Sequence, residues 1–80
     1  MCFFEAIVKR INTLMVEFEF TMEILQEKSK LSKDYLNDIL SNKKNDLLAL
    51  DLSKIISAFN ISLSEFFNDK IFLWKNLDLL

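Results

Sequence analysis

The chain has 80 residues, 51% of them hydrophobic, and a formal net charge of −2 at pH 7. This length fits one domain, and no apolar run reaches the roughly 18 residues that a transmembrane helix needs. The single cysteine, Cys2, excludes a disulfide within one chain and is typical of a protein of the reducing cytoplasm. The basic pair Lys9-Arg10 follows the first apolar stretch instead of preceding it, so we expect no signal peptide.

The residue types that carry enzyme and metal chemistry are scarce in this chain. It has no histidine, and because it has no glycine it cannot form a glycine-rich phosphate loop. Its one thiol lies beside the N-terminus, and its carboxylates are scattered rather than placed at the spacing of metal ligands. We therefore expect no catalytic activity, no metal, no cofactor, no small-molecule substrate and no membrane partner.

Apolar residues recur at helical spacing along most of the chain, which predicts an all-α fold. Five helices are expected near residues 3–18, 21–28, 32–41, 47–59 and 63–68. The buried stripe of the first is expected to comprise Phe4, Ile7, Ile11, Leu14 or Met15, and Phe18. The inner face of the fourth is expected to comprise Leu48, Leu52, Ile55, Ile56 and Phe59.

Polar residues are suitably placed to begin and end these helices. Thr21 and Ser32 are good N-caps, because a hydroxyl oxygen can accept a hydrogen bond from a backbone N–H of the first turn. Ser62, followed three positions later by Glu65, has the pattern of a capping box. Asn60 tolerates a left-handed backbone and can end the fourth helix where glycine would be usual.

Residues 21–41 predict a short helix, a tight turn and a second helix. Leu36, Ile39 and Leu40 share one face of the second helix, which we expect to be buried. Its opposite face carries four side chains able to hydrogen-bond to an external partner: Lys33, Asp34, Asn37 and Asp38. This is the outline of a helix-turn-helix motif, and equally of an ordinary αα-hairpin in a small bundle.

The last segment, residues 70–80, is more apolar than a five-helix core requires. A sixth helix is favoured, with Leu73, Leu77 and Leu80 on one side, and an extended arm is the alternative. We divide the chain into a domain over 1–69 and a tail over 70–80 that holds a homodimer together. The tail residues assigned to that interface are Ile71, Phe72, Leu73, Trp74 and Leu77. Two alternatives are that the tail folds back over Phe66 and Phe67 of its own chain, or that the dimer forms on Phe3, Phe4 and Ile7.

Positive charge is confined to one segment of this acidic chain. Residues 28–45 carry five lysines and two aspartates, a balance of +3, whereas residues 1–27 carry −3 and residues 46–80 carry −2. The positive segment spans the predicted turn, the second helix of the motif and the loop after it. Contact with a phosphate backbone needs local positive charge of this kind, although a solvated lysine-rich loop has the same composition.

Residues 7–68 resemble the lambda-repressor/Cro-like (XRE) family of helix-turn-helix regulators from bacteria and phages. The matching positions are Phe20-Thr21, Leu25, Leu31-Ser32, Leu36 and Ile39, together with the segment AFNISLSEFF from Ala58 to Phe67. The resemblance implies a compact five-helix DNA-binding domain. The order of the helices and both loop lengths also agree with the family.

Several positions depart from the family pattern. Met22 stands where the family usually has a glutamine that meets a DNA phosphate, and Gln26 replaces a small alanine between the two helices. Lys30 replaces the glycine of the turn, so it must adopt a costly left-handed backbone or reshape the turn. A buried Arg–Glu pair of the family falls here on Met15 and Leu40, which is consistent with exchange of an ion pair for apolar packing.

Two functions follow as expectations. The first is a cytoplasmic, repressor-like regulator that binds double-stranded DNA, as a homodimer on a palindromic operator, through the helix at 32–41. Its expected base contacts are Lys33, Asp34, Asn37 and Asp38. Its expected phosphate contacts are Thr21, Ser32, Tyr35, Lys43, Lys44 and Asn45, of which Tyr35 can instead pack on the turn. The second is a protein-interaction module of the same fold, such as an antirepressor or phage-type inhibitor, that has lost DNA binding.

Overall fold

The computed structural model describes residues 2–41 and 47–73, and within them the chain is helical without a strand. The helices are α1 (Phe3–Glu17), α2 (Met22–Ser29), α3 (Lys33–Leu40), α4 (Ala49–Ala58) and α5 (Leu63–Phe67), followed by a short 3-10 helix, η1 (Lys70–Phe72). The all-α expectation is confirmed for this part of the chain. No helix within the two described ranges has the length and apolarity needed to cross a membrane.

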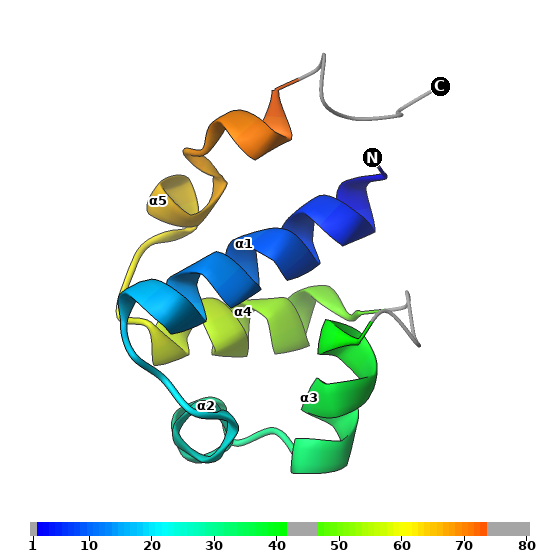
Figure 1. Cartoon of the computed structure of the whole chain (residues 1–80), viewed down its shortest axis with the longest axis vertical. Helices are drawn as coiled ribbons and strands as arrows, with labels where there is room; N and C mark the ends of the chain where they lie inside the picture. The colour runs from blue at the N-terminus through cyan, green and yellow to red at the C-terminus, as the bar shows by residue number, and fades with distance from the viewer. Residues whose placement is uncertain (1, 42–46, 74–80) are drawn as a thin grey trace.

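The helices are arranged along the long axis of the molecule with the motif at one end. In Figure 1, α1 and α4 lie in the middle, α2 and α3 lie at the bottom, and α5 and η1 lie at the top. α2 packs against both α3 and α4, and α1 packs against α3 and η1. α2 and α3 are therefore held by the central helices while their outer surfaces remain exposed.

The predicted caps are confirmed. The Thr21 side chain accepts from the backbone N–H of Ile24 at 3.2 Å, and Ser32 does the same for Tyr35 at 3.2 Å. Ser62 accepts from the N–H of Glu65 at 3.0 Å, and the Glu65 carboxylate accepts from the N–H of Ser62 at 3.4 Å, which completes the capping box. The starts of α2, α3 and α5 are therefore determined by local sequence.

Among residues 2–41 and 47–73, left-handed backbone occurs at Glu19 (φ 54°), Lys30 (φ 64°) and Asn60 (φ 56°). Lys30 ends α2 in this conformation, with its N–H donated to the carbonyl of Gln26 at 3.0 Å. The turn thus keeps the backbone that a glycine would give it, at a conformational cost of about 1–2 kcal/mol to a residue with a Cβ. Asn60 follows α4 as predicted.

The core is formed where α1, α2, α3, α4 and α5 meet. Its fully enclosed members include Ile11, Leu25, Leu36, Ile39, Ile55 and Phe66. Burial of Leu36 and Ile39 confirms the predicted inner face of α3. Met15 and Leu40 are half-buried and pack against the same cluster, so the two positions at which the resemblance implies an ion pair contribute apolar contacts here.

Two predicted core residues are wrong. Phe18 lies beyond the last turn of α1 and is 41% exposed, although its ring packs edge-on against Phe59 with centroids 5.5 Å apart. Leu48 is 65% exposed, because α4 begins at Ala49 and Leu48 is its extended N-cap. Helical periodicity assigns a residue to a face correctly only within a helix. Both errors arise because the predicted helices extended beyond the observed ends, at the C-terminus of α1 and at the N-terminus of α4.

The beginning of the tail folds back onto its own chain. Phe72 contacts Phe67 with centroids 5.0 Å apart, and it also packs near Phe3 and Phe66 at 6.0 Å from each. The backbone becomes extended at Leu73, so the predicted sixth helix is reduced, in the described residues, to the single 3-10 turn of η1. Trp74, Leu77 and Leu80 lie outside the described residues.

Arg10 joins α1 to the C-terminal end of α5. Its Nε donates to the carbonyl of Phe66 at 2.8 Å, and its Nη2 donates to the carbonyl of Glu65 at 3.0 Å. Its Nη1 lies 3.5 Å from Asp69 Oδ2, and Asp69 in turn accepts from the N–H of Ile71 at 2.9 Å. One guanidinium therefore donates to two carbonyl groups of the last turn of α5 and also contacts the turn that carries Phe72. The Glu65 carbonyl accepts in addition from the backbone N–H of Asn68 at 3.3 Å.

Candidate nucleic-acid interface

α3 lies at one end of the molecule (Figure 1), and its outer face presents polar side chains. Lys33, Asp34 and Asn37 are exposed and Asp38 is half-exposed, whereas Leu36 and Ile39 are fully buried on the opposite side. The predicted division of this helix into an inner and an outer face is thus confirmed. The structure brings the four expected base-contacting residues onto one surface, where they carry both signs of charge.

Lys33 is paired within the chain. Its Nζ donates to Glu23 Oε1 of α2 at 3.2 Å, and the two side chains are 52% and 69% exposed. The pair spans the turn and links the N-terminal ends of the two motif helices. Sequence reasoning missed Glu23, because ten positions separate it from Lys33 and only the angle between α2 and α3 brings them together.

The pKa of Glu23 is lowered below its ordinary value. The largest cause is a hydrogen bond from its own backbone N–H, followed by the hydrogen bond and charge of Lys33, with a smaller effect from the Thr21 hydroxyl. A carboxylate with a lowered pKa in the folded chain stabilises the fold above its unfolded pKa. That contribution is lost as pH falls through the folded pKa, and it is fully present at neutral pH.

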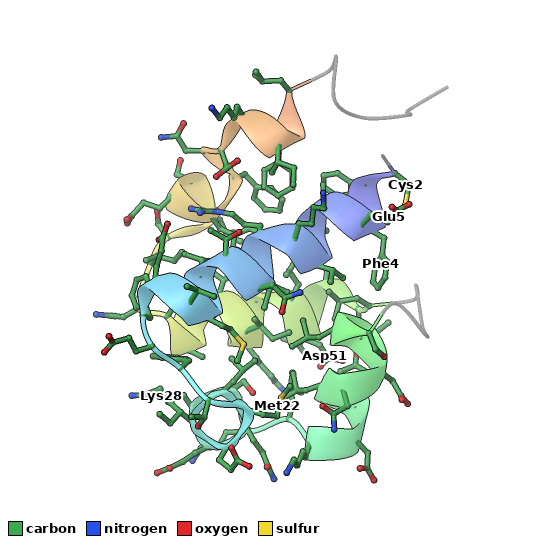
Figure 2. The ribbon with its side chains drawn as sticks, in the orientation of Figure 1. Cys2, Phe4, Glu5, Met22, Lys28 and Asp51 are labelled. Atoms are coloured by element: carbon green, nitrogen blue, oxygen red, sulfur yellow. The ribbon has the colours of Figure 1, made fainter. Side chains whose placement is uncertain are left out.

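Tyr35 connects α3 to α4. Its hydroxyl donates to Asp51 Oδ2 at 2.7 Å, and its side chain is half-buried. A phosphate would need the same hydroxyl hydrogen, so this geometry disfavours the phosphate contact. The hydrogen-bond partner of the Tyr35 hydroxyl lies on α4 and not on the turn, where the alternative placed the side chain. Asp51 is the second residue that sequence reasoning missed, and in Figure 2 it lies beside α3.

The remaining expected phosphate contacts divide into two groups. Thr21 and Ser32 are exposed at the starts of α2 and α3, where their oxygens are used as caps. Lys43, Lys44 and Asn45 lie outside the described residues. Two further lysines of the positive segment, Lys28 and Lys30, are exposed on and after α2.

An open groove of about 490 Å³ lies beside the turn of the motif. It is lined by Glu23, Gln26, Glu27, Lys30, Leu31 and Ser32. Gln26 is exposed and lines this groove, whereas Met22 is half-buried and packs against the core (Figure 2). The start of α2 therefore offers no side-chain amide to an incoming phosphate at that position.

Apolar surface is present on other parts of the domain. Leu48 and Leu50 are 65% and 66% exposed at the start of α4, beside a groove of about 290 Å³ lined by Phe3, Phe4, Ile7, Leu47, Ala49 and Leu52. Of the residues expected at a dimer interface, Leu73 is 48% exposed, and Ile71 and Phe72 are half-buried. Phe72 packs within its own chain, as the fold-back alternative predicts.

Comparison with known proteins does not assign the chain to a family. The chain matches no model of a known protein family, and searches among curated proteins and solved structures gave no significant match. Function is therefore inferred from the side chains of α2 and α3 and from their surroundings.

Proposed function

We propose that the protein is a repressor-like transcription regulator of the lambda-repressor/Cro-like family that binds double-stranded DNA. The observation that carries the proposal is the exposed polar face of α3, which follows a capped α2 and a tight turn and is backed by the buried Leu36 and Ile39. A helix held in this way can enter the major groove without rearrangement of the core.

In this proposal, the roles of the α3 side chains follow from their chemistry. Lys33 and Asn37 face outward and can donate to purine acceptors, and Asp34 or Asp38 can accept from a cytosine amine. Thr21, Ser32, Lys43, Lys44 and Asn45 are proposed to contact phosphates, which positions the protein without reading sequence. Tyr35 instead holds α3 against α4 through Asp51.

A DNA-binding titration tests the proposal. Fragments of the source genome are offered at low salt, and the duplex bound most tightly is titrated at increasing salt concentration. Lys43→Ala combined with Lys44→Ala should reduce the slope of log affinity against log salt by about one for each lost phosphate contact. The matched control is Lys70→Ala, since η1 lies at the end of the long axis opposite to α2 and α3 (Figure 1).

In the same titration, Asn37→Ala should relax sequence preference by about 1–3 kcal/mol at one base pair while leaving the salt slope unchanged. Absence of any bound duplex at low salt would reject DNA binding. It would favour the second candidate, a protein-interaction module of the same fold. That candidate is supported by the inward packing of Met22, by Glu23 paired with Lys33, and by Asp34 and Asp38 on the outer face of α3.

We also propose that the regulator acts in the cytoplasm as a homodimer on a palindromic operator, with two α3 helices about one DNA turn apart. Full-length protein at tens of micromolar should sediment as a dimer. Because Phe72 packs against the core of its own chain, the informative truncation ends at Leu73 and removes only residues 74–80. Loss of the dimer would place the interface on Trp74 and Leu77.

A dimer that survives truncation would instead point to the surface around Phe3 and Phe4, where apolar side chains are exposed. A full-length monomer under these conditions would reject the dimer. Circular dichroism of the truncated chain provides the control for folding.

A further inference from the structure

The pairing of Lys33 with Glu23 has a direct consequence for the proposed DNA contact. Lys33 begins α3, and its ammonium is already hydrogen-bonded to a carboxylate at 3.2 Å in the free chain. Both side chains are more than half exposed, and the proposed base contact of Lys33 places the pair on the surface that DNA would cover. A hydrogen-bond acceptor on the DNA must therefore share the Lys33 ammonium with Glu23 or displace Glu23 from it.

Sharing and replacement both oppose binding. An ammonium has three donors and can in principle hold two acceptors at once. In that arrangement the Glu23 carboxylate remains beside a negatively charged nucleic acid, and like charges in proximity repel. Replacement avoids the repulsion but loses the ion pair. A glutamate of ordinary pKa is already ionised at neutral pH, and the pKa of Glu23 is lower still, so it does not leave Lys33 by protonation.

We propose that Glu23 is an intramolecular competitor of DNA at Lys33, which lowers the affinity of this surface for duplex DNA. The inference rests on the proposed function and identifies a residue that limits it. The alternative role of the pair is structural, as a link that holds α2 and α3 in register. The two roles predict opposite signs, because removing a competitor strengthens DNA binding, whereas removing a structural link weakens it.

The variant Glu23→Gln tests this competition. It removes the charge while retaining the size of the side chain and its ability to accept from the backbone. Because exposed ion pairs contribute modestly, we expect about two- to fivefold tighter binding to duplex DNA at fixed low salt. The matched control is Glu27→Gln, which removes an exposed carboxylate one turn later on the same helix. It should give a smaller gain, because it reports only the change in overall charge.

A double-mutant cycle with Lys33→Ala isolates the contact. In the Lys33→Ala background, the gain from Glu23→Gln should fall to that of Glu27→Gln. Thermal unfolding of each variant shows whether the fold is retained. Equal or weaker DNA binding by Glu23→Gln, beside a wild-type protein that binds, would overturn the competition and leave the proposed function standing. Failure of the wild type and of every variant to bind duplex DNA would overturn both.

Discussion

Replacement of Leu36 by alanine should lower the free energy of unfolding by about 2–5 kcal/mol, because the side chain is fully buried and its removal leaves a cavity at the centre of the core. Leu36 belongs to the same cluster as Leu25 of α2 and Ile55 of α4. The cavity would therefore open where α2, α3 and α4 meet. Urea or thermal unfolding measures the loss.

The neighbouring residue provides the control. Asn37 is exposed on the outer face of α3, so Asn37→Ala should change the free energy of unfolding by no more than about 0.5 kcal/mol. Comparable losses for the two variants would mean that the faces of α3 are assigned wrongly. The same pair separates stability from recognition, since Asn37→Ala is expected to alter DNA preference in a chain that remains folded.

Removal of the Arg10 side chain is the second large effect. Arg10→Ala should cost about 1.5–3 kcal/mol, since it removes two hydrogen bonds from a charged donor to the carbonyls of Glu65 and Phe66. The guanidinium side chain is only 12% exposed, so water replaces these bonds incompletely. Phe72 should become more accessible at the same time, because the contact with Asp69 that positions η1 is lost.

Arg10→Lys should recover only part of the loss, because one ammonium cannot reproduce the fork that reaches both carbonyls and Asp69. Chemical denaturation of Arg10→Ala, Arg10→Lys and the adjacent Lys9→Ala decides the matter. Lys9 is exposed, so its replacement should leave the free energy of unfolding nearly unchanged. If Arg10→Lys recovered the full free energy of unfolding, a positive charge at this position would be sufficient for stability without hydrogen bonds to both carbonyls.

The candidate site was predictable as a surface but not as a set of contacts. The spacing of Leu36 and Ile39 was sufficient to place Lys33 and Asn37 on the outer face, because a helix has a fixed period. It gave no indication that Lys33 would meet Glu23 or that Tyr35 would donate to Asp51. Those contacts depend on how α3 is inclined toward α2 and α4, and no local pattern contains that angle.

Local sequence by itself determined where α2, α3 and α5 begin and where α4 ends. The hydroxyls of Thr21, Ser32 and Ser62 each satisfy a backbone N–H three positions later, within one turn, and Asn60 accepts the left-handed backbone after α4. Such features require no distant partner. Where a helix end had no such signal, as at Leu48, the predicted boundary was wrong.

Only the tertiary structure decided which distant residues meet. Arg10 and Phe66 are separated by 56 positions, and Phe72 packs near Phe3 across nearly the whole described chain. From its apolar character alone, Phe72 could pack equally well against a second copy of the chain or against its own chain. Phe72 packs within its own chain because Arg10 holds the end of α5 and contacts Asp69. Asp69 in turn bonds the backbone N–H of Ile71, so that Phe72 reaches the rings of Phe66 and Phe67.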